Sequence, residues 1–290
     1  MAAIVAAVPP SPLEDLTFSL VGPGRVGESL AGWLAAAGAR PVAVVGRAEL
    51  GRLATAGQDL LILSVPDAAL KGVAATLGAR RQARIVLHTA GGIGAEVLAP
   101  LGGPSGSALG SFHPLKAFPR PLPDPAEARG VFFALAGDPA AVALGERLAA
   151  ALGAEAALVP AGARPLYHFA ATLAAGGVTT LLAAAADVAG RLGLPPAVAR
   201  GYLELARGAV GEALAAGDAL EALTGPAARG DRATVERHLD DLARVAPEKV
   251  PLALHLARET LRQEERRGPL TDAQRSLAAE LDQRLGSARH

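Results

Sequence analysis

The sequence constrains the fold most strongly near its start, where an apolar run from Leu16 to Val21 leads directly into a glycine-rich turn. The turn consists of Gly22, Pro23, Gly24, Arg25, Val26 and Gly27. After it, residues 28–37 carry apolar side chains at helical spacing and end at Gly38. This order predicts a strand, a G-x-G-x-x-G turn and a helix, and it is this context that gives the motif its meaning.

Each glycine of such a turn has a physical reason to be there. The first allows the tight turn, the second lets a pyrophosphate approach the backbone, and the third permits close packing of the helix on the strand. The free amides at the helix start then face the anion. The turn therefore predicts a dinucleotide site in a Rossmann-type domain, and the alternative is a glycine-rich turn that binds nothing.

The composition limits the class of protein. The chain has 290 residues, 51% of them hydrophobic and 19% charged, which is enough for two domains. The formal net charge is +0 and aromatic residues make up 3%, so we expect no nucleic-acid partner. The chain has no cysteine, which excludes disulfides, thiolate metal ligands and a cysteine nucleophile, and we expect no metal site. These features fit a cytoplasmic protein.

The type of dinucleotide is predicted at the end of the second expected strand, Pro41 to Val45, which Gly46 and Arg47 follow. A site for NAD places an acidic residue here to bind the ribose hydroxyls, whereas the guanidinium of Arg47 pairs with a phosphate, so the sequence favours NADP. Arg25 in the glycine turn adds a second cationic contact. The alternative for Arg47 is an ordinary surface arginine. Only eleven residues, 48–58, precede the next strand, so the third strand of a complete mononucleotide-binding half is predicted to be missing.

Polar side chains follow the next three expected strands, at the points where those strands end. The carboxyl ends of parallel strands meet at one edge of a sheet, where open α/β sheets bind ligands. The expected cofactor contacts outside the glycine turn are Gly46, Arg47, Ser64, Val65, Pro66, His88 and Thr89. His113 and Lys116 follow the strand at 108–112, and we expect them on the nicotinamide side. His88 has a structural alternative, since a histidine at a strand end also satisfies loop carbonyls.

The second half of the chain has a different pattern. From Leu166 onward the strand signal disappears and the sequence is helical, with expected helices at 166–192, 196–216, 232–244, 247–267 and 272–285. The expected domains are a flexible arm at 1–15, a Rossmann-like dinucleotide-binding domain at 16–160 and a helical domain at 165–290. The predicted fold class is therefore α/β, a mostly parallel sheet followed by an all-α domain.

Two places in the helical half carry polar groups beyond what packing needs. Tyr167 and His168 open the first helix, and a turn-rich loop contains Arg229 and Asp231. The alternative for Asp231 is the N-cap of the helix that follows. The uncharged stretch from Phe169 to Ala186 reaches the minimum length of a membrane span, but its small side chains favour packing among helices, so we expect no membrane partner.

Several motifs occur in a characteristic order along the chain. They are Gly22-Pro23-Gly24-Arg25-Val26-Gly27, Val45-Gly46-Arg47, Ser64-Val65-Pro66-Asp67, His88-Thr89-Ala90-Gly91, Phe112-His113-Pro114-Leu115, Tyr167-His168, and Thr224-Gly225-Pro226 followed by Arg229-Gly230-Asp231. In this order the chain resembles a bacterial family of presumed NADP-dependent oxidoreductases, whose Rossmann-like domain precedes a helical domain of unknown function. More distantly it is similar to pyrroline-carboxylate reductases and to the phosphogluconate and β-hydroxyacid dehydrogenases.

The resemblance implies a homodimer formed through the helical domains. It also implies a substrate cleft between the two domains, lined by His113, His168 and the partner subunit's Arg229, but it names no substrate. The chain departs from the family at Ala175 and Gly176, where members commonly have Ser-Asn, and it lacks the lysine that β-hydroxyacid dehydrogenases carry on this helix. This departure bears on turnover and leaves the cofactor site intact.

The sequence thus predicts an NADP(H)-dependent oxidoreductase that transfers a hydride to or from a small carbonyl or imine substrate. We expect His113 to act as general acid, with His168 as the second candidate, because an imidazolium protonates the oxyanion that hydride addition leaves. Lys116 is expected to neutralise an anionic group of the substrate. The alternative is a catalytically idle dimer that senses NADP, and the loss of the polar pair at 175–176 is the feature that supports it.

Overall fold

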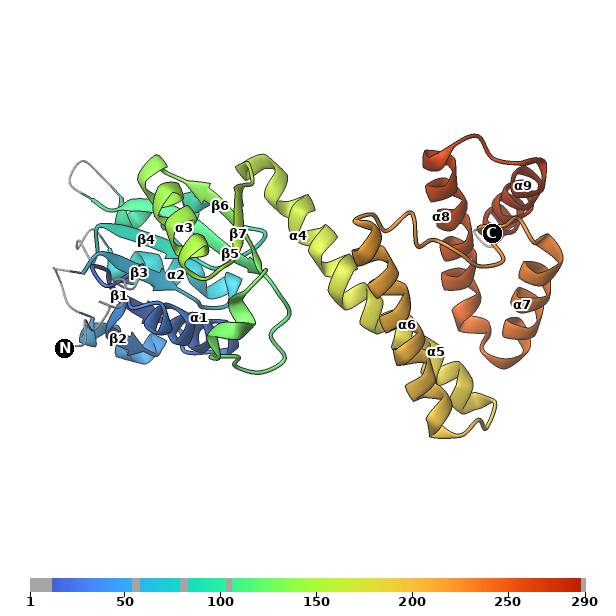
Figure 1. Cartoon of the computed structure of the whole chain (residues 1–290), viewed down its shortest axis with the longest axis horizontal. Coiled ribbons are helices and arrows are strands. Elements are labelled where there is room, and N and C mark those ends of the chain that lie inside the picture. Colours follow the sequence, from blue (N-terminus) through green and yellow to red (C-terminus); the bar gives the residue numbers. More distant parts are fainter. Residues whose placement is uncertain (1–11, 54–57, 79–82, 103–105, 288–290) are drawn as a thin grey trace, which may run out of the picture. The chain divides into compact units, whose positions relative to one another are not determined.

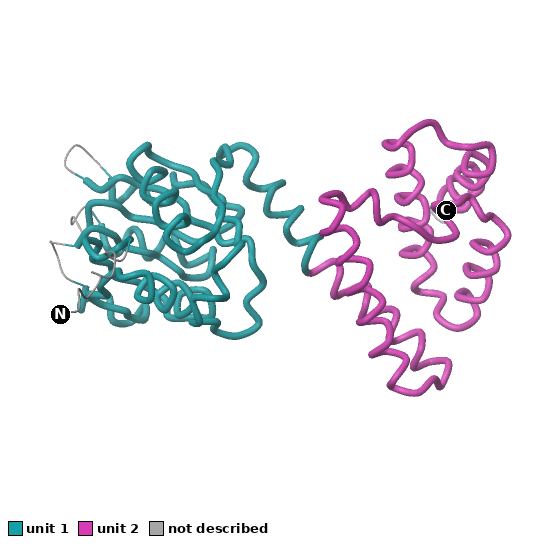
Figure 2. The backbone as a smooth tube through the Cα atoms, viewed as in Figure 1, with its two compact units in different colours: residues 1–175 teal, residues 176–290 magenta. Residues whose placement is uncertain are grey.

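The computed structural model of the chain describes residues 12–53, 58–78, 83–102 and 106–287. The chain divides into two compact units, Met1–Ala175 and Gly176–His290, which Figure 2 shows in different colours. The first unit carries all the strands of the described residues, and the described part of the second unit has helices and no strand.

One sheet forms the centre of the first unit. Its strands in the described residues are β1 (Thr17–Val21), β2 (Arg40–Val45), β3 (Leu60–Leu63), β4 (Ile85–His88), β5 (Ala108–Leu115), β6 (Phe132–Gly137) and β7 (Glu155–Leu158). They lie in the order β2-β1-β3-β4-β5-β6-β7. Neighbouring strands are parallel except β5 and β6, which are antiparallel. The predicted α/β fold with a mostly parallel sheet is confirmed.

The sheet has its edge at β2. Where a third strand of a mononucleotide-binding half would follow, the chain forms the 3-10 helix η1 (Arg47–Arg52) and then enters β3. Residues 54–57 between them lie outside the described part of the chain. Since β2 pairs with β1 and with no other strand of the described residues, the prediction that the third strand is missing is confirmed for these residues.

Helices cover both faces of the sheet, because its central strands are apolar on both sides (Figure 1). The helices of this unit are α1 (Arg25–Ala36), α2 (Asp67–Leu77), α3 (Pro139–Ala151) and α4 (Arg164–Thr172), with the 3-10 helices η2 (Ala95–Leu101), η3 (Pro125–Ala128) and η4 (Ala161–Ala163). α1 and α3 pack on one face, in a core where the rings of Phe112 and Phe133 stack at 4.1 Å. α2 and η2 pack on the other face.

The ends of the first unit differ from the predicted boundaries. Most of the arm predicted at 1–15 lies outside the described residues, but Leu13 is fully buried and Asp15 pairs with Arg147 of α3. As a correction to the predicted arm, residues 12–15 therefore pack on the folded unit. At the other end, α4 belongs to this unit and not to the helical one, because Arg164 at its start is fully buried.

The second unit is helical, as the sequence predicts, and its last four helices lie close to the predicted ranges. The helices of this unit are α5 (Val178–Arg191), α6 (Pro196–Ala216), α7 (Arg232–Val245), α8 (Val250–Arg267) and α9 (Asp272–Ser287), with the 3-10 helix η6 (Pro247–Lys249) before α8. α7, α8 and α9 share a leucine-rich core, and α5 packs along α6. The helix predicted at 166–192 is interrupted by a π-helical turn, η5 (Leu173–Gly177), which separates α4 from α5.

Several helices leave large apolar side chains uncovered. α6 has no fully buried residue, and Leu203, Val210 and Leu214 on it are 54%, 49% and 77% exposed. Within the described residues, one segment, Ala161–Arg191, has the length and hydropathy of a candidate membrane span, and none of its most apolar window is buried in the chain.

Candidate functional site

The three glycines of the turn differ in the space around them. Gly22 has a φ of +92°, and a Cβ added there would lie 2.3 Å from the carbonyl oxygen of Ser64. A Cβ at Gly27 would lie 2.2 Å from the carbonyl oxygen of Gly22, so neither position accepts a side chain. At Gly24 a Cβ would meet nothing within 4 Å. The first and third glycines are thus required by the fold, whereas the second faces open space.

Helix α1 begins at Arg25 directly after this open space. No side chain of the described residues caps it, so its first amides remain available to an anion. Pro23 and Arg25 are exposed beside Gly24, and Val26 packs partly into the core. The exposed turn and the uncapped amides leave room for an anionic group, and the pyrophosphate of a dinucleotide is such a group.

The end of β2 presents an arginine that is not engaged by its neighbours. Glu49 of η1 accepts a hydrogen bond from the backbone N–H of Gly46 at 3.1 Å and pairs with Arg52, and these two contacts hold the pKa of Glu49 below its usual value. Arg47 is exposed and forms no ion pair with any described residue. Its guanidinium is therefore available to a phosphate group, as is that of Arg25.

The ends of β1, β3 and β4 meet as expected. The hydroxyl of Thr89 donates to the hydroxyl of Ser64 at 3.3 Å, so these two predicted residues lie side by side. Val65 is buried, and its side chain is the one that a Cβ at Gly22 would strike at 2.9 Å. Pro66 is exposed and stands directly before α2. Ser64 and Thr89 thus present hydroxyl groups next to the glycine turn.

His88 is occupied by its own loop. Its Nδ1 accepts a hydrogen bond from the backbone N–H of Ala90 at 3.1 Å, which leaves Nε2 to donate to the carbonyl oxygen of Gly94 at 3.1 Å. Burial is the main reason that the pKa of His88 is lowered to about 4. With both ring nitrogens bound to backbone, the geometry favours the structural alternative for this side chain over contact with a cofactor.

His113 and His168 come together beside Gly91. Nδ1 of His113 lies 3.0 Å from the hydroxyl oxygen of Tyr167, and the imidazole rings of His113 and His168 meet edge to face at 5.7 Å between centroids. A Cβ on Gly91 would lie 2.4 Å from Nδ1 of His168 and 2.7 Å from Nε2 of His113. Only a glycine therefore allows both rings to occupy these places. We call His113, Tyr167, His168 and Arg164 the histidine cluster.

Arg164 is the buried member of this cluster. It is 0% exposed, and its guanidinium donates to the carbonyl oxygens of Ile93 and Ala90 at 2.8 and 2.9 Å and to the hydroxyl of Ser111 at 2.6 Å. Ser111 lies level with His88 in the parallel pairing of β4 and β5. The arginine therefore ties the glycine-rich loop after β4 to β5 and fixes the start of α4.

The surroundings of His113 keep its ring uncharged. Burial is the largest cause that lowers the pKa of His113 to about 4, and the nearby His168, Arg164 and His88 lower it further. Burial likewise raises the pKa of Tyr167. His113 is therefore neutral near pH 7 in the free protein, which corrects the expectation of an imidazolium there.

Three other predicted residues make contacts of their own. Lys116 pairs with Glu127 at 2.9 Å, and no contact among the described residues joins it to His113. Asp231 caps α7 by accepting from the backbone N–H of Thr234 at 3.1 Å, which is the alternative stated for it, and Arg229 beside it is exposed. The roles expected for Lys116 and Arg229 at a substrate stay predictions.

Sequence reasoning missed two members of the site. Arg164 lies between the two expected domains, at 16–160 and 165–290, and Gly91 was noted only as part of a motif. The signal for Arg164 was an isolated arginine directly before Pro165, which stands in the first turn of a helix where proline is favoured. Its burial depends on contacts with residues 53 to 74 positions away, which no local pattern shows.

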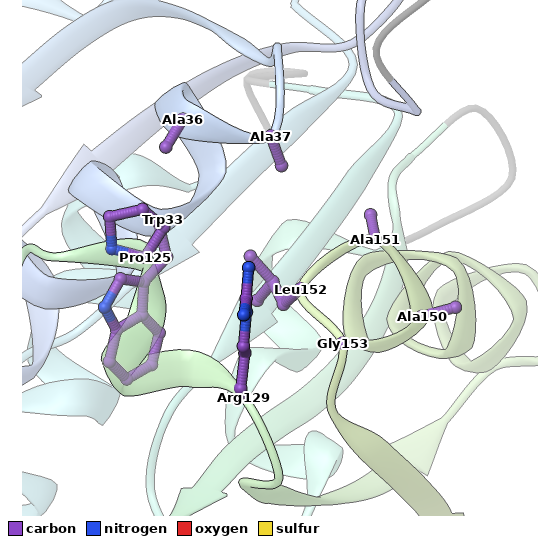
Figure 3. A pocket seen from close by; sticks show the side chains of 9 residues that line it. All are labelled: Trp33, Ala36, Ala37, Pro125, Arg129, Ala150, Ala151, Leu152 and Gly153. Atoms are coloured by element: carbon purple, nitrogen blue, oxygen red, sulfur yellow. The ribbon is translucent and has the colours of Figure 1, made fainter. Parts of the chain in front are cut away.

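A separate surface pocket lies at the opposite end of α1 from the glycine turn (Figure 3). It has a volume of about 360 Å³ and is lined by Trp33, Ala36, Ala37, Pro125, Arg129, Ala150, Ala151, Leu152 and Gly153. α1 is about 18 Å long from its twelve residues at the usual helical rise. No residue of the predicted cofactor site or of the histidine cluster lines this pocket, so it is not part of the candidate site.

Solved structures share this fold. Protein TM1727 from Thermotoga maritima aligns with a TM-score of 0.67 at 19% identity, over 86% of this chain and 99% of that one. The "putative NADP oxidoreductase BF3122" from Bacteroides fragilis aligns with a TM-score of 0.67 at 24% identity, over 85% and 98% of the two chains. Pyrroline carboxylate reductase from Plasmodium falciparum, with NADP bound, aligns with a TM-score of 0.56 at 13% identity, over 87% and 98%.

At these identities the likeness establishes the fold alone. A search of the curated proteins finds no significant match. Two family models match the chain: residues 11–114 match the Rossmann-like domain, and residues 131–269 match a domain of unknown function, DUF2520. The chain is therefore a protein that joins a Rossmann-like domain to a DUF2520 domain.

Proposed function

We propose that this protein is an NADP(H)-dependent oxidoreductase that acts on a small carbonyl or imine substrate. The observation that carries the proposal is the glycine turn, in which Gly22 and Gly27 accept no side chain while Gly24 faces open space at the uncapped start of α1. When bound, the nicotinamide supplies or accepts a hydride. Two of the similar structures support the choice, because one is described as an NADP oxidoreductase and the other contains NADP.

The residues that hold the dinucleotide follow from their positions. The amides after Gly24 bind the pyrophosphate, and Arg47, which no described carboxylate engages, binds the phosphate on the adenosine ribose. Arg25 adds positive charge next to the same turn. Ser64 and Thr89 offer hydroxyls at the ends of β3 and β4. The preference for NADP over NAD rests on Arg47.

The proton moves through His113 and Tyr167. In our proposal the hydroxyl of Tyr167 donates to Nδ1 of His113, so the neutral ring carries its proton on Nε2. That proton passes to the substrate oxygen or nitrogen as hydride arrives at the adjacent carbon. The Tyr167 proton then moves to Nδ1, and water restores it to the half-buried hydroxyl. The reverse sequence serves oxidation.

His168 remains a second candidate for proton transfer. The imidazole ring of His168 lies against that of His113, and His168 is exposed, so it is placed to exchange protons with solvent. Lys116 and Arg229 are proposed only as charges that attract an anionic substrate. Lys116 is already paired with Glu127 and would have to leave that partner to bind one.

We also propose that the chain forms a homodimer through the second unit. Leu203, Val210 and Leu214 lie on one side of α6 at spacings of seven and four, and all are exposed. α6 also carries the exposed ion pair of Glu204 and Arg207 at 2.6 Å, which makes lipid an unsuitable cover for this helix. A second copy of the same face buries the leucines and leaves the charges in water.

The test is oxidation of NADPH by the purified protein with a panel of small aldehydes, ketones and cyclic imines, followed by loss of NADPH absorbance. Wild type and His113→Asn are compared. The proposal predicts turnover with at least one substrate and a loss of about a hundredfold in the variant. NADPH binding without turnover over the whole panel would instead support the alternative of an NADP sensor, which Gly176 in the π-helical turn favours.

A further inference from the structure

The histidine cluster contains a buried positive charge that no carboxylate neutralises. Arg164 is 0% exposed, and its hydrogen bonds all go to uncharged acceptors, two carbonyl oxygens and one hydroxyl. No aspartate or glutamate among the described residues lies within 4.0 Å of it, and its Nη1 is buried without a hydrogen-bond partner there. A buried guanidinium without a counter-ion is costly, because burial removes its hydration and nothing replaces it.

Other groups packed around this arginine add little negative charge. Burial lowers the pKa of Arg164, while Tyr167 and Glu96 act in the opposite direction. Glu96 on η2 is exposed and makes no ion pair with Arg164. From β4 and β5 the neighbours are His88 and His113, and both lose protons readily. Cations are thus disfavoured here, and an added anion is favoured.

One nitrogen of each of two imidazoles lies beside Gly91. Nε2 of His113 and Nδ1 of His168 would both lie within 2.7 Å of a Cβ on Gly91. Neither nitrogen has a hydrogen-bond partner among the described residues, whereas the second nitrogen of His113 is used by Tyr167. His168 is exposed, so solvent reaches the cluster from that side, while Arg164 lies behind it in the interior.

We propose that the histidine cluster binds a carboxylate group of the substrate, with His168 as the hydrogen-bond donor and Arg164 as the fixed positive charge behind it, while Nε2 of His113 beside them serves the reacting oxygen or nitrogen. This inference rests on the proposed function and narrows its substrate class: the carbonyl or imine compound carries a carboxylate. The carboxylate supplies the negative charge that Arg164 lacks. Its negative charge also raises the pKa of the neighbouring His113 above the value in the free protein.

A purely structural role is the alternative for Arg164, and the experiment separates it from carboxylate binding. Its bonds to Ile93, Ala90 and Ser111 hold the loop after β4 against β5, and that role requires no ligand. A purely structural arginine predicts that small carboxylates do not bind and that the histidines respond to none of them.

The experiment is a titration of the ¹⁵N-labelled full chain with pyruvate at pH 7, following the ring nitrogens of its histidines by NMR. His113→Asn and His168→Asn assign the two signals, and pyruvamide, the uncharged analogue, serves as the control ligand. We expect saturable shifts of both signals with pyruvate, a millimolar Kd and a rise in the His113 pKa, with no such change for pyruvamide. Equal responses to the two ligands, or none to pyruvate up to about 50 mM, would overturn the proposal.

Variants test the roles of the individual side chains. Arg164→Lys keeps the charge and should weaken pyruvate binding by less than about threefold, whereas Arg164→Met should weaken it at least about tenfold. Because a change at a buried arginine threatens folding, His168→Asn on the exposed side provides the second test, with an expected loss of about tenfold. Glu96→Gln, which removes the exposed carboxylate nearby, should bind pyruvate as well as wild type or better. Wild-type affinity in His168→Asn would contradict the proposal.

Pyruvate binding and NADPH binding are tested separately, so that the carboxylate site and the proposed oxidoreductase can fail independently. The titration is done both without a dinucleotide and with NADP⁺, while NADPH binding is measured separately. Pyruvate binding without any NADPH binding would overturn the proposed oxidoreductase and keep the carboxylate site. NADPH binding without pyruvate binding would do the reverse.

Discussion

The hydroxyl of Tyr167 lies 3.0 Å from Nδ1 of His113, although 54 positions separate the two residues in the sequence. The contact brings the start of α4 to the end of β5 and gives His113 a defined partner on one ring nitrogen. Its other nitrogen faces Gly91. This arrangement joins a half-buried, neutral histidine to a half-exposed hydroxyl, which is what proton transfer to a substrate requires.

The first prediction concerns this pair. Tyr167→Phe removes the hydroxyl that bonds Nδ1, and we expect the rate of hydride transfer to fall about a hundredfold while NADPH affinity stays within about twofold. The chain has one other tyrosine, so Tyr202→Phe on α6 is the matched control and should leave the rate unchanged. Single-turnover oxidation of NADPH measures the step. An unchanged rate in Tyr167→Phe would remove Tyr167 from the proton path.

The second prediction separates the glycines of the turn. Gly24→Val introduces a side chain into open space, so the melting temperature should stay close to that of wild type while NADPH affinity falls at least about tenfold. Gly27→Ala places a Cβ 2.2 Å from the carbonyl of Gly22 and should lower the melting temperature clearly.

Gly72→Ala provides the control for both glycine variants. Gly72 lies inside α2 with nothing within 4 Å of an added Cβ, and alanine there should stabilise the chain by about 1 kcal/mol without affecting NADPH. Wild-type NADPH affinity in Gly24→Val would show that the space beside this glycine is not used.

The third prediction is a pH dependence of stability between pH 6.5 and 4. The pKa of His88 and of His113 falls from 6.5 to about 4 on folding, so in this range the unfolded chain binds more protons than the folded one. The free energy of unfolding should therefore decrease as the pH falls, by up to about 3 kcal/mol for each histidine. Carboxylates whose pKa is lowered, such as that of Asp59, add their loss only at lower pH.

Denaturant unfolding at several pH values checks this slope. His113→Asn should flatten it, whereas His238→Asn, a change on the exposed face of α7, should leave it as in wild type. A stability that stays constant from pH 7 to pH 4 would show that these histidines are not buried in their neutral form.

The fourth prediction concerns the exposed leucines of α6. Replacing both Leu203 and Leu214 by Glu places charges on one side of the helix and should convert a dimer into monomers, as measured by light scattering. Leu205 is equally exposed at 71% but lies on the opposite side of α6, so Leu205→Glu should remain dimeric. A wild-type protein that is monomeric at micromolar concentration would contradict the proposed interface.

The sequence predicted the fold wherever the signal was local. Gly22 and Gly27 follow from strand-to-helix geometry, and β3 was recognisable as a continuous apolar run. The missing third strand followed from chain length alone, since too few residues lie between β2 and β3. The helices of the second unit followed from periodicity and from glycines at their ends.

What the sequence did not predict depends on contacts between distant segments. The burial of Arg164, and hence the place of α4 in the first unit, results from bonds to residues of the loop after β4 and of β5. The neutral state of His113 follows from that burial and from neighbouring cations, which residue type alone does not reveal. The π-helical turn at Leu173–Gly177 has a double glycine as its local signal, and nothing in the sequence shows that the helix changes its hydrogen bonding there.

The central claim is that the glycine turn and Arg47 hold NADP, and isothermal titration with NADPH and NADH tests it most directly. Arg47→Gln is compared with Arg52→Gln, an arginine of the same 3-10 helix that pairs with Glu49. The account predicts micromolar NADPH binding by wild type, at least about tenfold weaker binding in Arg47→Gln, and wild-type binding in Arg52→Gln. Absence of NADPH binding at millimolar concentration, or equal affinity for NADPH and NADH that Arg47→Gln leaves unchanged, would contradict it.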